Sequence, residues 1–174
     1  MNRSEMLQEM KAMRTSSQEL TRKLEQLIQK MEQEGLEDNR QETQDISQLL
    51  EDIYPLTKTP SFFRGRRPVG VIFPDGTRIR TTSWKGVVEA VLKDCNQTPG
   101  MHDSLMELRN RVYGNSRIIL GDSSEEMKSP ITICPEIYFE AHYDVESLLR
   151  ITLTRILSVI GYDFSGIKVV VRKV

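Results

Sequence analysis

The sequence contains only two cysteines among its 174 residues, Cys95 and Cys134. They form no CxxC pair and show none of the spacings of a zinc site. Both lie in apolar surroundings, "AVLKDC" and "ITICPE". The sequence therefore predicts two buried, reduced thiols rather than a structural metal centre.

Long apolar runs are absent as well. No stretch approaches the length needed to cross a bilayer. The first twenty residues, "MNRSEMLQEMKAMRTSSQEL", are polar and charged, unlike the apolar core of a signal peptide. We therefore expect a cytoplasmic protein that makes no membrane contact.

The chain also lacks a large net charge, with 24 Lys and Arg against 25 Asp and Glu. Its first 60 residues hold 8 basic and 12 acidic side chains, and the remainder holds 16 and 13. No Walker sequence, GxGxxG turn or GxSxG elbow is present, so the common phosphate cradles and the serine-hydrolase nucleophile are excluded. These absences favour a non-enzymatic protein, and no cofactor is expected.

The N-terminal region carries the clearest pattern, a heptad register that continues without a break until Gly35. Apolar residues follow one another at alternating steps of four and three, with Ser17 as the polar exception. The a and d positions are Met6, Met10, Met13, Ser17, Leu20, Leu24, Leu27 and Met31. This spacing predicts a coiled-coil helix over residues 1–34.

A helix of this length is marginal in water, so its apolar stripe needs a partner. A second copy of the chain or another coiled-coil protein would supply one. The alternative is a helix that folds back onto its own body. The strict seven-residue repeat favours the coiled coil, because a helix on a globular core usually follows a 3.6-residue period.

Residues 35–67 are expected to connect this helix to the body. A short helix is predicted over Thr43–Tyr54, with Ile46, Leu49, Leu50 and Ile53 on one face. Pro55, Pro60 and Pro68 then indicate a linker or extended arm. We place the domain boundary there and expect an α/β binding domain over 68–174.

The body is predicted to be of the α+β class, with the element order β-β-α-α-β-β-α-β. A hairpin is expected over 68–81, and a helix with one buried stripe begins near Trp84. A further helix over Met101–Tyr113, strands in 116–120 and 131–141, a long helix capped by Asp144 and a closing strand over 167–173 complete a mixed sheet packed by helices. Pro135 divides 131–141 into one bent strand or two short ones.

The segment "FFRGRRP" and the strand "TRIR" provide the best candidate contact surface. Its members are Phe62, Phe63, Arg64, Arg66, Arg67, Arg78 and Arg80. Arginines hold phosphates and aromatic rings stack on bases, so the set suits a nucleic acid. In the alternative interpretation the two phenylalanines clip the arm onto the body and the arginines are solvated.

One local cluster resembles a metal or catalytic site. On an extended strand Glu140, His142 and Asp144 would share a face and could hold a divalent cation. The competing interpretation makes Asp144 the cap of the following helix, and it is favoured because no distant ligand completes the set.

Two longer phrases carry a resemblance, "PVGVIFPDGTRIRTTSWKGVVEAVL" and "IYFEAHYDVESLLRITLTRILSVIGYDFSGIKVVV". Together they resemble a small α/β module of bacterial proteins linked to mobile elements, restriction and phage defence, where it often follows a coiled-coil or effector segment. The resemblance implies an accessory or regulatory binding protein, and no catalytic residue is carried over from it.

The function expected from the sequence is therefore that of a non-enzymatic oligomeric protein whose body contacts a nucleic acid or a protein partner. Two alternatives stay open. One is a metal-dependent nuclease or hydrolase that uses the Glu140 cluster, and the other is a purely structural coiled-coil adaptor.

Overall fold

The computed structural model describes residues 22–23, 51–114 and 117–173. The chain divides into two units between Leu49 and Leu50, and the second unit runs from Leu50 to Val174. Arg22 and Lys23 are helical and exposed. The heptad residues lie outside the described residues, as does the 43–50 part of the predicted short helix, so the coiled coil stays a prediction. The heptad residues outside the described ranges are Met6, Met10, Met13, Ser17, Leu20, Leu24, Leu27 and Met31.

Four strands of the second unit form sheet A, in the order β1-β8-β2-β3. Their bounds are Glu51–Pro55 for β1, Pro68–Ile72 for β2, Arg78–Arg80 for β3 and Lys168–Arg172 for β8. All three pairings are antiparallel. The last strand of the chain thus lies between β1 and β2 and closes the sheet, with Val169 and Val171 fully buried on its inner face.

A second antiparallel sheet, sheet B, has the order β4-β5-β7-β6. It is built from Val112–Tyr113, Ile118–Gly121, Ile137–Glu140 and Pro130–Cys134, which are β4, β5, β7 and β6. β6 and β7 form a hairpin around Pro135, so the two-strand interpretation of this segment is correct. The buried side chains of Ile131 and Phe139, which pair across these strands, provide its contribution to the core.

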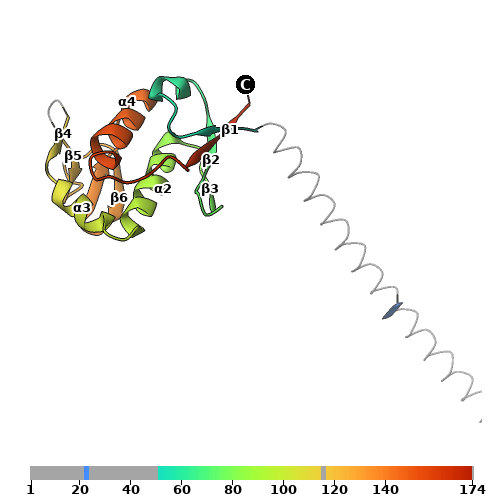
Figure 1. Cartoon of the computed structure of the whole chain (residues 1–174), viewed down its shortest axis with the longest axis horizontal. Coiled ribbons are helices and arrows are strands. Elements are labelled where there is room, and N and C mark those ends of the chain that lie inside the picture. The colour runs from blue at the N-terminus through green and yellow to red at the C-terminus, as the bar shows by residue number, and fades with distance from the viewer. Residues whose placement is uncertain (1–21, 24–50, 115–116, 174) are drawn as a thin grey trace, which may run out of the picture. The chain divides into compact units, whose positions relative to one another are not determined.

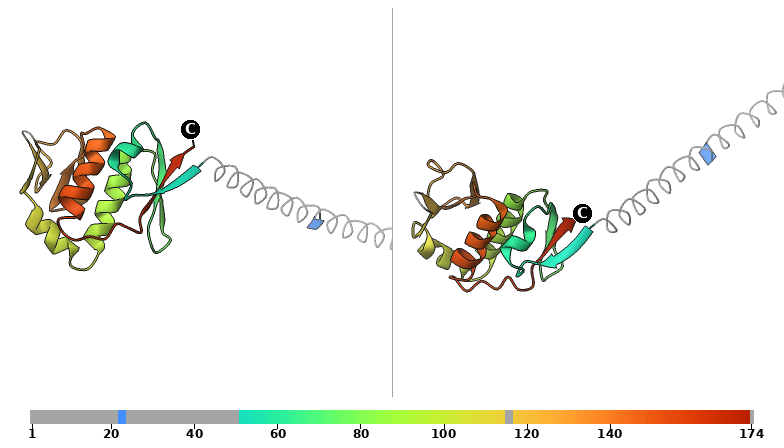
Figure 2. Two further views of the ribbon diagram at one scale, coloured as in Figure 1. Left: turned by 45° about the horizontal axis from the view of Figure 1, so that its top comes forward. Right: turned by 90° about the horizontal axis from the view of Figure 1, so that it is seen from above.

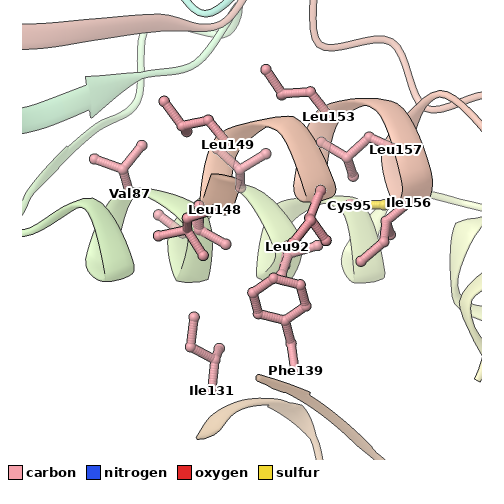
Figure 3. Packing of buried hydrophobic residues seen from close by; sticks show 14 of the residues in the cluster. Val87, Leu92, Cys95, Ile131, Phe139, Leu148, Leu149, Leu153, Ile156 and Leu157 are labelled. Carbon is pink, nitrogen blue, oxygen red and sulfur yellow. The ribbon is translucent and has the colours of Figure 1, made fainter. Parts of the chain in front are cut away.

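The helices α2 (Trp84–Gln97) and α4 (Val145–Arg150) lie between the two sheets (Figures 1 and 2). Leucines and isoleucines of the last helical segment meet Val87, Leu92 and Cys95 of α2, with Ile131 and Phe139 below them (Figure 3). Burial raises the pKa of the Cys95 thiol to about 12, so this cysteine is an inert core residue. Within the described part of the chain, no helix combines the length and the apolar character that a bilayer crossing requires.

The predicted stripe of α2 is confirmed, because all six of its members are buried. They are Trp84, Val87, Val88, Val91, Leu92 and Cys95. Ser83 caps the helix by accepting a hydrogen bond from the Gly86 amide, and Asp144 caps α4 by accepting one from the Ser147 amide. Local pattern and local capping chemistry agree at both places.

The last helix is α-helical up to Arg150 and continues from Ile151 as a π-helix, η2 (Ile151–Leu157). Three hydroxyls donate to carbonyl oxygens of the preceding turn: Thr152 to Leu148, Thr154 to Arg150 and Ser158 to Leu153, at 2.6 to 2.8 Å. These hydroxyls compete with backbone amides for the carbonyls. The wider turn, closed by a bond from the Ser158 amide to the Leu153 oxygen, follows from that competition.

The predicted helix and linker over 43–67 are wrong where the structure describes them. Glu51–Pro55 is strand β1, and a single turn of 3-10 helix, η1 (Pro60–Phe63), follows it. Pro55 disfavours helical backbone at Tyr54, and Ile53 and Tyr54 suit a strand. Leu56 and Phe63 are buried in the core, so residues 51–67 belong to the body rather than to a linker.

Two further expectations about the body need correction. The predicted helix over Met101–Tyr113 ends early, because α3 covers only Met101–Leu108. Asn110 has a left-handed backbone (φ 60°) and its side chain bonds Asp122, which turns the chain into β4. The single mixed sheet is also wrong, since the described strands form two sheets in which every pair is antiparallel.

Candidate functional site

The structure separates the arginines that the sequence groups together. Arg64 forms an ion pair with Glu146 of α4 at 2.5 Å. Arg66 lies over the rings of Tyr54 and Phe62, with its guanidinium carbon 5.1 and 4.3 Å from their centroids, and its Nε donates to the Phe62 carbonyl. These two arginines therefore hold the arm against the body and are not grouped with the others.

The two phenylalanines of the arm are part of an aromatic row. Tyr54, Phe62, Phe63 and Trp84 follow one another with ring centroids 4.8, 5.3 and 5.0 Å apart. Phe63 is completely buried, and the Trp84 Nε1–H donates to the Arg66 carbonyl. Phe63 therefore has no access to a base, and the aromatic row fixes the arm, as the alternative interpretation of this segment expected.

The other candidate arginines come together on the outer face of sheet A. Cross-strand partners share a face, and the register places Ile53, Val170, Gly70 and Arg80 in one row. The next row on the same face is Pro55, Lys168, Ile72 and Arg78, and Glu51 pairs with Arg172 at the far end. The core residues Val71, Val169 and Val171 point to the opposite face.

We use "outer face of sheet A" for this surface, whose charged members are Glu51, Arg78, Arg80, Lys168 and Arg172. Its four basic residues are exposed, and Glu51 is the single carboxylate among them. Arg67 lies beside Arg172, since its carbonyl accepts a hydrogen bond from the Arg172 amide at 2.9 Å, and it is exposed. The outer face thus has a clear excess of positive charge, although the chain as a whole has none.

Glu51 and Arg78 cross this face as an ion pair of 2.5 Å between the two edge strands. Strands β8 and β2 lie between these two residues, and the register places Val170 of β8 and Gly70 of β2 between the row of Glu51 and the row of Arg78. Val170 is completely buried although it points away from the core. A Cβ at Gly70 would lie 2.9 Å from the Ile79 carbonyl oxygen, so only glycine fits this close approach of β3.

A second feature, which we call the basic hollow, lies between sheet B and the last helix. It has a volume of about 680 Å³. Its basic side chains are Arg117, Lys128, Arg150 and Arg155, which come from four separate positions in the chain. Among the described residues none of these four forms an ion pair. Arg155 donates to the Tyr113 carbonyl at 2.8 Å, which fixes the position of its guanidinium.

Glu140 and His142, from the suspected metal cluster, also line the basic hollow, whereas Asp144 does not. Glu140 is buried, and its carboxylate accepts hydrogen bonds from the amides of Lys128 (2.6 Å), Ser129 (3.0 Å) and His142 (2.9 Å). Burial alone would raise the pKa of Glu140, but these three amides lower it overall. Within the described ranges, no three His, Cys, Asp or Glu side chains are grouped as a metal site.

Tyr143 is another lining residue of the basic hollow. Its pKa is raised, first by burial and then by Glu140, while the nearby charges of Arg155 and Arg117 act in the opposite direction. Its hydroxyl comes within 3.1 Å of the Cβ that a side chain at Gly114 would add, so the glycine leaves room for it. The hydroxyl is consequently protonated at neutral pH and can donate a hydrogen bond.

Sequence reasoning found Glu140 and His142 but missed the four basic residues of the hollow. Its residues have no motif spacing, since Arg117 and Arg155 are separated by most of sheet B and by α4. The one available signal was the excess of basic over acidic residues after residue 60, which does not say where they meet.

Comparison of the chain with family models, with curated protein sequences and with solved structures finds no match. The class of the described part is that of an α+β unit with two antiparallel sheets and helices between them.

Proposed function

We propose that this protein is a non-enzymatic nucleic-acid-binding protein, and that the outer face of sheet A contacts the phosphate backbone. The observation that supports this proposal most directly is the grouping of Arg80, Lys168 and Arg172 on one exposed face, beside Arg67. Arg78 is already paired with Glu51, so it orders the surface rather than contacting phosphate.

The outer face carries no aromatic side chain, and it therefore lacks the stacking platform by which many modules read single-stranded bases. Contacts from basic residues to phosphates supply affinity without sequence preference. We accordingly propose binding that is weakly specific, with several copies acting together through the N-terminal heptads. The bacterial defence or mobile-element context suggested by the sequence resemblance is part of the same proposal.

The test measures affinity for a short DNA duplex at several salt concentrations. In the variant with Arg80→Gln, Lys168→Gln and Arg172→Gln, we expect the slope of log K against log salt to fall by about 1 for each lost phosphate contact. A variant with Lys58→Gln, Lys93→Gln and Arg111→Gln removes the same charge from exposed positions elsewhere and is the control. An equal loss in both variants, or no binding by the unmodified protein, would refute the proposal.

A further inference from the structure

The basic hollow has the composition of a site for an anionic ligand. Four basic side chains surround it, and within the described part of the chain none is neutralised by an ion pair. Its one lining carboxylate, Glu140, is turned to the three backbone amides that it accepts from. An anion placed there would therefore meet several cations and little opposing charge.

From this arrangement we infer that the basic hollow binds a phosphate group carried by a ligand of nucleotide size. Guanidinium groups match phosphate oxygens with paired N–H donors, and Arg117, Arg150 and Arg155 supply three of them. Lys128 adds a fourth cation, and the Tyr143 hydroxyl adds a neutral donor.

The size and the apolar lining indicate a ligand larger than a bare phosphate. A volume of about 680 Å³ lies within the range of small-molecule sites. Ile151 keeps 7% of its exposure and contributes apolar surface to the wall, where a sugar or base could pack. The π-helical turn that begins at Ile151 supplies this isoleucine together with Thr154 and Arg155, and π-helical turns frequently occur at functional sites.

Two sources could supply such a phosphate: a free nucleotide, or the terminal phosphate of a nucleic-acid strand. The inference does not depend on the outer face of sheet A, because the two surfaces share no residue. The experiment uses the full chain and four probes: inorganic phosphate, adenosine monophosphate, and a short single strand with or without a 5′-phosphate. Adenosine is the uncharged control.

Two variants with matched loss of charge separate the surfaces. One carries Lys128→Gln and Arg150→Gln in the basic hollow, and the other carries Arg80→Gln and Lys168→Gln on sheet A. All four side chains are exposed, so we expect thermal midpoints close to that of the unmodified protein. If the double variant of the hollow is destabilised, Lys128→Gln alone replaces it.

The first variant should bind the phosphate-bearing probes about tenfold more weakly or worse, whereas the second should bind adenosine monophosphate with unchanged affinity. A preference for adenosine monophosphate over adenosine identifies a free nucleotide as the source. A preference confined to the 5′-phosphorylated strand identifies a strand terminus. The inference is overturned if no phosphate-bearing probe binds at millimolar concentration, or if both variants weaken binding equally.

Failure of this inference and failure of the proposed function give different results. Loss of duplex binding only in the sheet A variant, with no phosphate-dependent binding of the small probes, supports the proposed function and refutes the inference about the hollow. The reverse pattern supports the hollow and refutes the role of the sheet.

Discussion

Glu51 and Arg78 form an ion pair that joins the two edge strands of sheet A, although 27 positions separate them in the chain. Their side chains keep 17% and 34% of their exposure, and Val170 lies completely buried between the strands that they connect. A pair in this setting is more shielded from water than an ordinary surface pair. It is therefore expected to stabilise the sheet by joining its two edge strands.

A double-mutant cycle with Glu51→Gln and Arg78→Gln should give a coupling free energy of about 1 kcal/mol, measured by urea unfolding. The pair Glu89 and Lys93 on α2 is the control, because it has similar geometry (2.6 Å) but greater exposure. Its cycle should give about 0.3–0.5 kcal/mol. A coupling for Glu51 and Arg78 no larger than that of the control would contradict the structural role assigned to it.

The corrected boundary of the body predicts opposite behaviour for two truncated chains. A chain that starts at Leu50 keeps β1, Leu56 and Phe63 and should fold as a monomer. A chain that starts at Pro68 loses an edge strand and two core side chains, each with 1% exposure or less, and should not fold. Removing a single buried Phe side chain already costs about 3–5 kcal/mol. Circular dichroism and sedimentation of both chains check this.

The same experiment, extended to the full chain, tests the heptad prediction. The full chain should sediment as an oligomer at micromolar concentration, and the chain from Leu50 should not. Equal masses per particle for the two would show that residues 1–34 do not associate.

The elements predicted correctly from the sequence are those determined by neighbours within a few positions. The α2 stripe, the Asp144 cap, and the hairpin of β2 and β3 all depend on local spacing. Strand β1 was missed because its pairing is remote: Ile53 lies opposite Val170, and the apolar positions before Pro55 fit a helical face as well. A local pattern cannot distinguish the two when the partner strand is more than 100 residues away.

The outer face of sheet A was likewise predictable only where its residues are close together in the sequence. Arg78 and Arg80 lie on one face of β3, as the alternation of side chains within a strand requires, and that alternation is local. Lys168 and Arg172 reach that face only because β8 enters the middle of the sheet. The neighbouring Arg64 and Arg66 leave it because Glu146 and the ring of Tyr54 are nearby in space, which adjacency in the sequence does not indicate.

The stacking of Arg66 predicts a stability effect that its neighbour lacks. Arg66→Ala removes cation–π contacts with Tyr54 and Phe62 and a hydrogen bond to the Phe62 carbonyl, and should cost about 1–2 kcal/mol. Arg67→Ala is the control, because its side chain is exposed, and should change stability by less than about 0.5 kcal/mol. Arg66→Lys should recover part of the loss. Thermal unfolding of the three variants decides the matter, and equal midpoints for Arg66→Ala and Arg67→Ala would exclude the role given to the stack.

Glu140 predicts a pH-dependent contribution to stability. Although burial opposes its charge, three backbone amides lower its pKa below that of the unfolded chain, which is about 4.3. The charged form therefore stabilises the fold above that pH, and its contribution is lost as the pH falls through the lower pKa of the folded state.

Glu140→Gln should be less stable than the unmodified protein by about 1–3 kcal/mol at pH 7, because the amide group replaces an acceptor with a donor facing backbone N–H groups. Below about pH 4 this difference should shrink. The exposed residue Glu136, changed to Gln, is the control and should show no such trend. Urea unfolding between pH 3 and pH 7 measures the difference directly, and a gap that stays constant over this range would mean that the carboxylate charge is not what holds the loop before β6 to the end of β7.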